Sequence, residues 1–224
     1  MERGLFCAEM NEPATVSVPP PGGVHIWQRL RIPFSIVFAL AVLGGVAFSE
    51  SYWRSAAPLV GSLLLATGVV LAAIGGFGRV WCSVYAAGYK NKVLITEGPY
   101  SMSRNPLYFF SLVGSLGVGL STQTLTVPVV IAAVFSIYYP LVIRGESQIL
   151  SQIHGDAYSE YLSKVPAFFP RRGSLVEPKT YTVRPKVIRR HIASAIWFVW
   201  FIAVILIFAG LRAIGLLPPL LTLY

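Results

Sequence analysis

Four long stretches of this sequence contain no Asp, Glu, Lys or Arg, and they constrain its fold more than any other feature. They cover residues 32–49, 55–78, 105–143 and 192–211. About twenty mostly apolar residues suffice to cross a bilayer as a helix. The third stretch is about twice that long and has a polar break at 121–124, so we expect it to fold as a helical hairpin. The sequence therefore predicts an all-α integral membrane protein with about five transmembrane helices.

The composition and the charge distribution agree with that prediction. Of the 224 residues, 55% are hydrophobic and 12% are charged, against roughly a quarter charged in a soluble domain, so a soluble fold is excluded. With a cytoplasmic N-terminus, every Lys and Arg except Arg54 and Arg212 falls on the inner side, which is the side that positive residues favour. The net charge of +9 is then explained by topology and attraction to anionic lipids, and it does not predict nucleic-acid binding.

The chain divides into four parts. We expect a flexible, proline-containing tail (1–24), the first two transmembrane helices (25–78), a core with the helical hairpin (79–170), and a basic linker with the last helix (171–224). Within these parts, the polar segments 79–104 and 144–190 carry nearly all the ionisable groups and flank the hairpin. A site built from them lies at the cytosolic mouth of the helices, with a catalytic segment between the last two, where a water-soluble reagent meets a membrane-dissolved one. This placement predicts an enzyme that acts on a lipophilic substrate.

Other classes of membrane protein are less well supported. The four apolar stretches contain no ionisable residue, whereas pumps, channels and coupled transporters place such groups near the midplane. A transporter is therefore the third choice, after an enzyme and a non-catalytic membrane protein. Two cysteines, Cys7 and Cys82, give neither a disulfide framework nor a four-ligand zinc site, and the scattered histidines suggest no metal site.

The first polar segment ends in a helix start that suits an anion. Gly98-Pro99 signals a turn, Pro106 suits the first turn of a helix, and Asn105 is a candidate cap. Arg104 therefore sits beside a helix N-terminus at the membrane surface, where a carboxylate or phosphate is attracted. The alternative for Arg104 is a simple topology charge.

The second polar segment continues a helix out of the membrane. Apolar residues recur at helical spacing up to Gly155, where we expect the helix to stop. Glu146 falls about one turn past the membrane edge, where its carboxylate could orient the amino or hydroxyl groups of a cofactor or simply be solvated. Tyr158 and Tyr161 lead into an aromatic, proline-rich return that suits the bilayer interface, and an interfacial belt is the alternative role for either tyrosine.

Together the two segments resemble the integral membrane methyltransferases that include isoprenylcysteine carboxyl methyltransferase and the phospholipid N-methyltransferases. The resemblance covers about residues 79 to 170. It rests on these positions: Gly98-Pro99-Tyr100, Arg104, Pro106, Tyr108, Gly117, Gly119, Glu146, Leu150, Gly155, Tyr158, Tyr161 and Val165-Pro166. Three residues depart from the family pattern: Asn105 replaces a His, Ser147 replaces a second Glu, and His154 replaces a Phe. Asn105 cannot titrate, so this position offers no base.

The resemblance implies S-adenosylmethionine as the methyl donor, with S-adenosylhomocysteine as the product and no metal. It implies a donor pocket made of Tyr100, Asn105, Pro106, Tyr108, Gly117, Gly119 and Glu146. It also implies that Arg104, Tyr158 and Tyr161 bind the acceptor, and that Arg104, Glu146 and Tyr108 are the catalytic residues. Methyl transfer is an in-line displacement that depends on the alignment of donor and acceptor, so no metal is required.

The acceptor stays open between a prenylcysteine-like carboxylate and a lipid head group, and membrane lipids are the expected partners. A carboxylate is already ionised at neutral pH and needs no base, which slightly favours an oxygen nucleophile. The rival interpretation is a non-catalytic protein of the same fold that acts as a lipid-binding scaffold, and Asn105 and Ser147 support it. The oligomeric state is not predicted.

Overall fold

The computed structural model describes residues 24–86, 93–183 and 185–224, and it is mostly helical. The predicted helical class is confirmed, whereas the span count and topology are not tested by the fold alone. Most of the tail predicted for residues 1–24 lies outside the described residues, as do Lys90 and Lys92. The elements in chain order are α1 (Val24–Ala47), β1 (Ser49–Ser51), α2 (Tyr52–Ala56), α3 (Pro58–Ala86), α4 (Pro99–Met102), α5 (Pro106–Leu120), α6 (Thr126–Lys164), α7 (Pro185–Ala195), α8 (Trp197–Ala213) and β2 (Leu221–Leu223).

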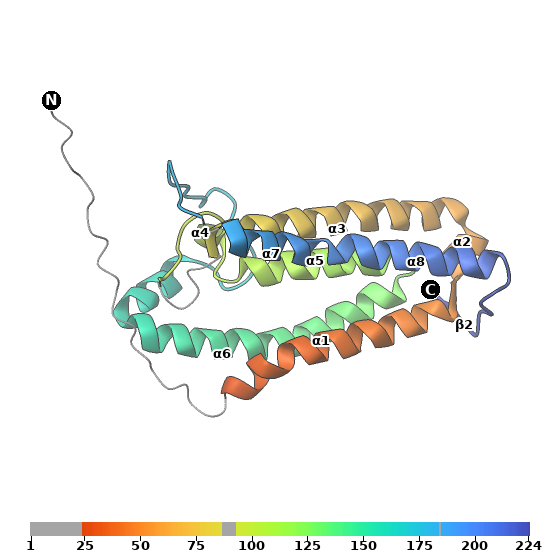
Figure 1. Ribbon diagram of the computed structural model, residues 1–224, viewed down its shortest axis with the longest axis horizontal. Helices are drawn as coiled ribbons and strands as arrows, with labels where there is room; N and C mark the ends of the chain where they lie inside the picture. Colours follow the sequence, from red (N-terminus) through yellow and green to blue (C-terminus); the bar gives the residue numbers. More distant parts are fainter. Residues whose placement is uncertain (1–23, 87–92, 184) are drawn as a thin grey trace.

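The long helices lie side by side in an elongated bundle (Figure 1). Contacts join α1 to α6, α6 to α5, α5 to α3, and α8 to α1, α3 and α5, so α8 packs between α1 and the α3–α5 pair. α7 and α8 follow one another almost in line (Figure 1). The short strands β1 and β2, which were not predicted, pair in parallel at the end of the bundle that also holds α2.

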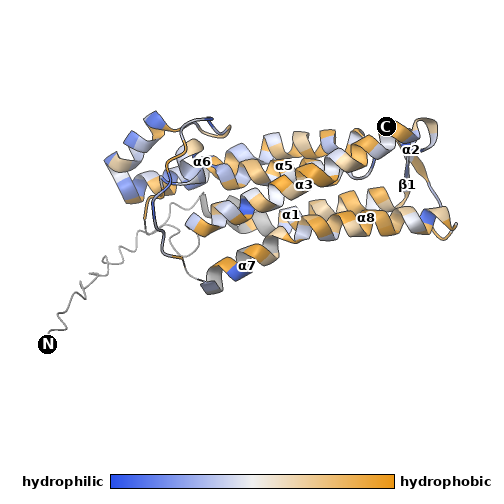
Figure 2. Ribbon diagram, turned by 90° about the horizontal axis from the view of Figure 1, so that it is seen from above, coloured by the Kyte–Doolittle hydropathy of each residue, from blue (hydrophilic) through white to orange (hydrophobic). Residues whose placement is uncertain are grey.

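Two of the described helices, α3 and α6, are long and apolar enough to cross a membrane. Shorter apolar helical stretches cover Pro33–Ala47, Pro106–Leu120 and Trp197–Ala213. Hydrophobic residues dominate the surface along the bundle, whereas hydrophilic residues collect at the end opposite the strands (Figure 2). We call this hydrophilic end, which includes α4 and the loop after α6, the polar end, and the end with β1 and β2 the strand end.

Small residues bring α3 and α5 together. A Cβ at Gly75 would collide with the backbone of Gly114, and one at Gly117 would collide with the backbone nitrogen of Ala72. Backbones that approach this closely leave no room for a side chain, which is the usual function of small residues between membrane helices. The α3–α5 pair therefore makes the most extensive helix–helix contact among the described residues.

The helix boundaries follow the sequence in some places and depart from it in others. The predicted break of the third apolar stretch is found between α5 and α6, where Gln123 adopts a left-handed φ of 63°. α3 continues to Ala86, so Arg79 lies inside a helix rather than in a loop. Gly155 does interrupt α6, with a φ of 50° and a ψ of −122°. The chain then resumes as a helix to Lys164 instead of ending there.

Candidate active site

Backbone hydrogen bonds join the two polar segments at the polar end. The Gly98 N–H donates to Val176 O (2.8 Å), the Arg171 N–H donates to Met102 O (2.9 Å), and the Arg104 N–H donates to Pro166 O (2.9 Å). We call residues 97–105 and 165–176, which these bonds connect, the strap. The two polar segments, separated by the helical hairpin in the sequence, thus meet in space as predicted.

Two serines that sequence reasoning passed over hold the strap in place. Ser103 is fully buried, and its hydroxyl donates to Phe168 O (2.8 Å). The Ser101 hydroxyl donates to Gly98 O (2.7 Å) and accepts from the Val176 N–H (2.9 Å). Serine hydroxyls commonly satisfy backbone groups in segments without regular structure. The only sequence signal for this role is the presence of two serines between a turn and a helix start.

The start of α5 differs from the prediction in one respect. Pro106 is buried and occupies the first turn, as expected. Asn105 stands at the cap position, but its side chain caps no α5 N–H. Its Nδ2 instead donates to Ala167 O in the strap (2.8 Å). Asn105 therefore ties the helix start to the strap, so the predicted capping role is wrong.

Arg104 has a buried nitrogen atom with no protein partner. Its Nε is inaccessible to solvent and makes no hydrogen bond. The guanidinium acts on Tyr161, because Arg104 opposes the rise that burial and Tyr158 cause in the pKa of the Tyr161 phenol. An unsatisfied buried donor is costly and usually indicates a missing partner such as a ligand or water. Arg104 is therefore suited to an anion or another acceptor brought from outside the chain.

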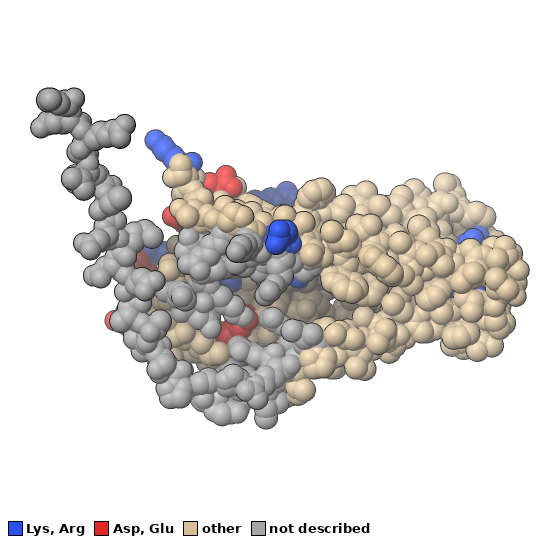
Figure 3. Space-filling model, viewed as in Figure 1, with Lys and Arg blue, Asp and Glu red and all other residues tan. Residues whose placement is uncertain are grey.

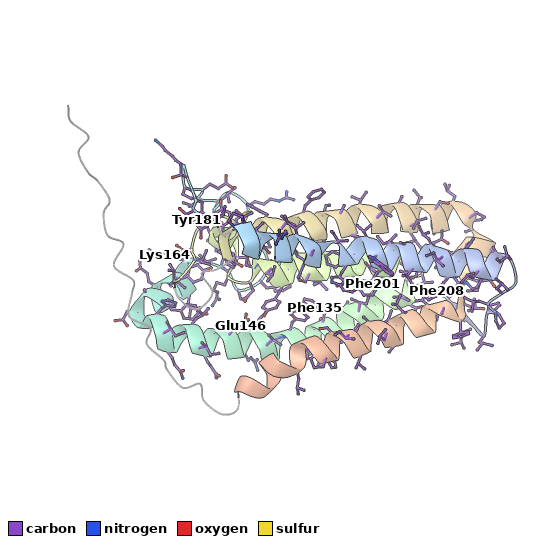
Figure 4. The ribbon with its side chains drawn as sticks, viewed as in Figure 1. Phe135, Glu146, Lys164, Tyr181, Phe201 and Phe208 are labelled. Atoms are coloured by element: carbon purple, nitrogen blue, oxygen red, sulfur yellow. The ribbon has the colours of Figure 1, made fainter. Side chains whose placement is uncertain are left out.

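Three predicted site residues, Tyr108, Glu146 and Tyr161, gather around Tyr100 on α4, together with Cys82. Burial raises the pKa of the Tyr100 phenol well above its ordinary value, and Cys82, Tyr161, Glu146 and Tyr108 raise it further through their own charges. Such effects fall off steeply with distance, so these side chains share one neighbourhood. Figure 4 shows Glu146 on the side of α6 that faces the α3–α5 layer. Residues from α3, α4, α5 and α6 thus converge at the polar end.

The segment after Gly155 folds back over α6 and reaches this cluster. We call residues 156–164 the return helix. Tyr158 and Tyr161 are 4% and 7% exposed, so the alternative of an interfacial belt is wrong for both. The Tyr161 hydroxyl donates to Tyr100 O (2.7 Å), and the Tyr158 hydroxyl donates to Ser147 Oγ (2.9 Å). Because Gly155 turns the chain, these phenols point into the protein.

A group of aromatic side chains, the aromatic cluster, lies next to the polar residues around Tyr100, on the side of Tyr108. Tyr108 is 6% exposed and packs with Phe135, Tyr138 and Val142. Phe34 on α1 stacks on Tyr138 with ring centroids 4.6 Å apart, and Phe135 lies between the helix layers in Figure 4. Polar groups around Tyr100 therefore lie next to an apolar, aromatic wall that connects to α1.

The charged side chains of the described residues are also distributed unevenly between the two ends of the bundle. In Figure 3, Lys, Arg, Asp and Glu side chains gather around the polar end, and a small basic group appears at the strand end. At the strand end, Arg212 donates to Val46 O (2.7 Å) and Ala47 O (3.1 Å), where α1 ends. The two ends of the bundle thus carry different kinds of polar contact.

Comparison with known proteins identifies the family. A family model described as phospholipid methyltransferase matches residues 55–157. The chain is also 37% identical over 215 residues to the cobalt-zinc-cadmium resistance protein CzcN of Cupriavidus metallidurans, covering 94% of this chain and 98% of that one. The chain belongs to the phospholipid methyltransferase family. The membrane methyltransferase resemblance drawn from the motifs is therefore confirmed.

A second relative of this chain is also named for metal resistance. It is the nickel-cobalt-cadmium resistance protein NccN of Alcaligenes xylosoxydans xylosoxydans, 37% identical over 175 residues, which is 78% of this chain and 77% of that protein. No solved structure gives a significant match. The family assignment indicates methyl transfer in a membrane setting, while the relatives' names refer to metal resistance and identify no acceptor.

Two predicted residues of this family member lie away from the cluster. Gly117 packs on the backbone of α3, and a Cβ at Gly119 would lie 3.0 Å from Pro128 on α6. Both glycines are more than ten residues along α5 from Pro106, which is about 16 Å or more along a helix. The structure therefore brings together Tyr100, Arg104, Tyr108, Glu146 and Tyr161, with Tyr158 beside them, and assigns Gly117 and Gly119 to helix packing.

Arg79 is a partly buried cation inside α3, whereas the sequence predicted for it only a topology charge. Its Nη1 donates to the hydroxyl of Ser111 on α5, and it acts electrostatically on Cys82. Ionisable residues inside membrane helices are expensive and mostly functional. The signal was present in the sequence, because Arg79 follows directly on an apolar stretch.

Proposed function

We propose that this protein transfers the methyl group of S-adenosylmethionine to a lipophilic acceptor at the cytoplasmic face of the membrane. The observation that carries the proposal is the unsatisfied, buried Nε of Arg104, which lies in one neighbourhood with Tyr161 and, through it, with Tyr100, Glu146 and Tyr108. A cluster of polar groups with a missing partner is the arrangement expected of a binding site. The family assignment supplies the reaction type.

The residues of the cluster fit the chemistry of this donor. When bound, S-adenosylmethionine supplies an electrophilic methyl group on a cationic sulfonium. The Glu146 carboxylate accepts hydrogen bonds from amino or ribose hydroxyl groups, whereas Arg104 donates to a carboxylate or phosphate. We assign Glu146, Tyr100 and the helix start at Asn105 and Pro106 to the donor. Tyr108 lies where the donor groups meet the aromatic cluster, and we assign it to alignment of the two reactants.

The acceptor side is assigned to Arg104, the aromatic cluster and the return helix. Arg104 holds the polar group of the acceptor, and Tyr158 and Tyr161 close the site above it. The aromatic cluster accommodates the apolar part of the acceptor. A prenylcysteine-like carboxylate and a lipid head group both combine these features. The carboxylate needs no general base, so it places fewer demands on this set of residues.

The membrane arrangement proposed here has five spans and a cytoplasmic N-terminus. The spans are α1, α3, α5, the first part of α6, and the apolar stretch 192–211, which comprises the end of α7 and most of α8. α5 has 15 residues, about 22 Å of helix, which is shorter than the roughly 30 Å hydrocarbon core. Arg104 and the strap therefore reach into the edge of the bilayer, where a lipid head group arrives without leaving the membrane.

The relatives' names suggest the physiological setting. Both relatives are named for resistance to metal cations, and we propose the same setting for this chain. Guanidinium groups have no lone pair to offer a metal ion and bind anions instead, so the cluster around Arg104 suits a membrane component rather than the cation itself. Methylation of such a component is the contribution that we propose.

The test is methyl transfer to membrane lipids. Purified protein in detergent is incubated with total lipid extract and S-adenosylmethionine that carries a radiolabelled methyl group, and the lipids are then separated by class. We expect label in one lipid class. Release of the label as methanol in mild alkali identifies a carboxyl ester, whereas alkali-stable label identifies methylation of a head-group amine. A protein that binds neither the donor nor S-adenosylhomocysteine would instead be a non-catalytic scaffold of this fold.

A further inference from the structure

The return helix is attached to the candidate site through a glycine turn and two phenol hydroxyl groups. Gly155 has a φ of 50°, a backbone conformation that side chains rarely adopt. Nothing lies within 4 Å of a Cβ built on Gly155. A side chain at this position would therefore be strained by the backbone conformation rather than by contact with its surroundings.

Beyond this turn, the buried polar contacts of the return helix come from two tyrosines. Tyr161 donates to Tyr100 O (2.7 Å), and Tyr158 donates to Ser147 Oγ (2.9 Å). Among the described contacts, the other side-chain bonds of this helix are local and exposed: Ser159 to Gly155 O, Ser163 to Glu160 O, and the Lys164–Glu160 ion pair. Within the return helix, Tyr158 and Tyr161 thus make the buried side-chain hydrogen bonds that hold it over the site, while the strap holds the chain that follows it.

Ser147 connects the return helix to the donor side of the site. It directly follows Glu146 on α6, and the Tyr158 hydroxyl bridges from Ser147 across eleven residues of chain. The Ser147 hydroxyl accepts a hydrogen bond from the Tyr158 phenol in this geometry. The departure from the family pattern at this position therefore coincides with a hydrogen bond between α6 and the return helix.

We infer that Ser147 is a positioning residue: through Tyr158 it fixes the return helix, and so holds Tyr161 on Tyr100 and closes the donor end of the site. This inference rests on the function proposed above. Ser147 touches neither reactant in this account. Loss of its hydroxyl lets the return helix move on the Gly155 turn, which exposes the donor to water and weakens its binding.

The experiment measures donor affinity and the position of the return helix in the same proteins. S-adenosylhomocysteine is titrated calorimetrically into purified wild type, Ser147→Ala, Tyr158→Phe, the double variant and Ser147→Thr in detergent. Hydrogen exchange of residues 156–164 is followed in parallel without ligand. Ser163→Ala is the matched control, because its hydroxyl lies on the exposed side of the same helix and bonds only within it.

We expect each single variant to weaken S-adenosylhomocysteine binding about five- to tenfold and to speed exchange in the return helix. Because one hydrogen bond is removed in every case, the double variant is no weaker than the singles. Ser147→Thr retains the hydroxyl and restores affinity, and Ser163→Ala behaves as wild type. These results support the inference.

Three outcomes overturn it, and they are distinguishable. Unchanged affinity in Ser147→Ala and Tyr158→Phe, with normal binding by wild type, removes the positioning role and leaves the proposed function standing. Additive losses in the double variant also overturn it, because the two residues would then act separately. Absence of binding by wild type contradicts the proposed function itself, and the inference falls with it.

Discussion

The polar end and the strand end of the bundle both contain buried polar groups, but the two ends use them differently. At the strand end, Arg212 donates to the last carbonyls of α1. Ser51 donates to Gln123 O (2.6 Å), and the main-chain oxygen of Tyr224 accepts from the N–H groups of Leu125 and Thr126 (2.7 Å each). These contacts connect α1, the α5–α6 turn and the end of the chain.

At the polar end, one nitrogen of the Arg104 guanidinium is left without such a partner. Arg104 Nε is buried and makes no hydrogen bond, and the guanidinium acts on the Tyr161 phenol, which bonds to Tyr100. The strand end is not free of unsatisfied groups, since Trp53 Nε1 is buried there without a partner. That group is a neutral donor on an apolar ring, however, whereas Arg104 carries a full charge. The difference indicates that polar groups at one end stabilise the bundle and those at the other await a ligand.

The largest effect is expected at Arg104. Arg104→Ala removes the charge proposed to hold the acceptor, so methyl transfer falls about a hundredfold or more, while the thermal unfolding temperature changes little. Activity is measured with radiolabelled donor and lipid extract. Arg171→Ala, an exposed arginine of the same strap, is the matched control. Near-normal turnover in Arg104→Ala would mean that the arginines at both ends have no role in methyl transfer, and it would remove Arg104 from the site.

Substitution of a glycine in α5 distinguishes a role in helix packing from a role in donor binding. In Gly117→Ala the new methyl group meets the α3 backbone, so we expect a loss of about 1–3 kcal/mol in stability and an unchanged donor affinity in the folded fraction. Gly44→Ala, where nothing lies within 4 Å, is the control and should be neutral or slightly stabilising. Weakened donor binding without destabilisation would return Gly117 to the donor pocket.

Glu146 tests the donor side of the polar end. Glu146→Ala removes a charged acceptor proposed to bind the donor, so S-adenosylhomocysteine affinity should fall about tenfold. Calorimetric titration in detergent measures this, and Glu160→Ala on the exposed side of the return helix serves as the control. Equal affinities in the two variants would place Glu146 outside the donor contacts.

Arg212 tests the strand end. Arg212→Ala leaves the carbonyls of Val46 and Ala47 without this donor, and we expect a loss of about 1 kcal/mol in stability with normal methyl transfer below the unfolding temperature. Thermal unfolding and activity are measured on the same preparation. Arg54→Ala, with an exposed side chain, should change neither quantity. A loss of activity in folded Arg212→Ala would show that the strand end also serves the chemistry.

The smallest effect concerns alkaline pH. Burial raises the pKa of Tyr161 above its ordinary value, so the folded protein keeps this proton after the unfolded chain has lost it. The resulting stability is present below the unfolded pKa of about 10 and is lost as the pH rises above it. Tyr161→Phe should therefore lose less stability than wild type between pH 9 and 11 (about the accessible range). Parallel pH curves for the two proteins would mean that Tyr161 ionises freely.

The sequence predicted those features that depend on local chemistry. The break between α5 and α6, the turn at Gly98 and the position of Pro106 all follow from residues within a few positions of one another. The contacts of Asn105, Tyr158 and Tyr161 were not predicted, because each side chain is satisfied by a partner that is brought near only by folding. Asn105 reaches Ala167, and Tyr161 reaches Tyr100.

The same distinction explains the strands and the glycines. β1 pairs with β2 across almost the whole chain, and neither segment has a strand pattern of its own. Gly117 and Gly119 matched a family motif, but the motif does not say whether a glycine admits a ligand or a neighbouring helix. The packing of α5 decides between the two roles, because Gly117 faces α3 and Gly119 faces α6.

Covalent mapping of the bound donor tests the central claim most directly. Radiolabelled S-adenosylmethionine is cross-linked to the purified protein by ultraviolet light, and the labelled peptides are identified after proteolysis. Label on peptides from 97–108 and 144–166, prevented by excess S-adenosylhomocysteine, is the predicted result. Label confined to peptides of the strand end, or no label that S-adenosylhomocysteine displaces, would contradict a single donor site at the polar end.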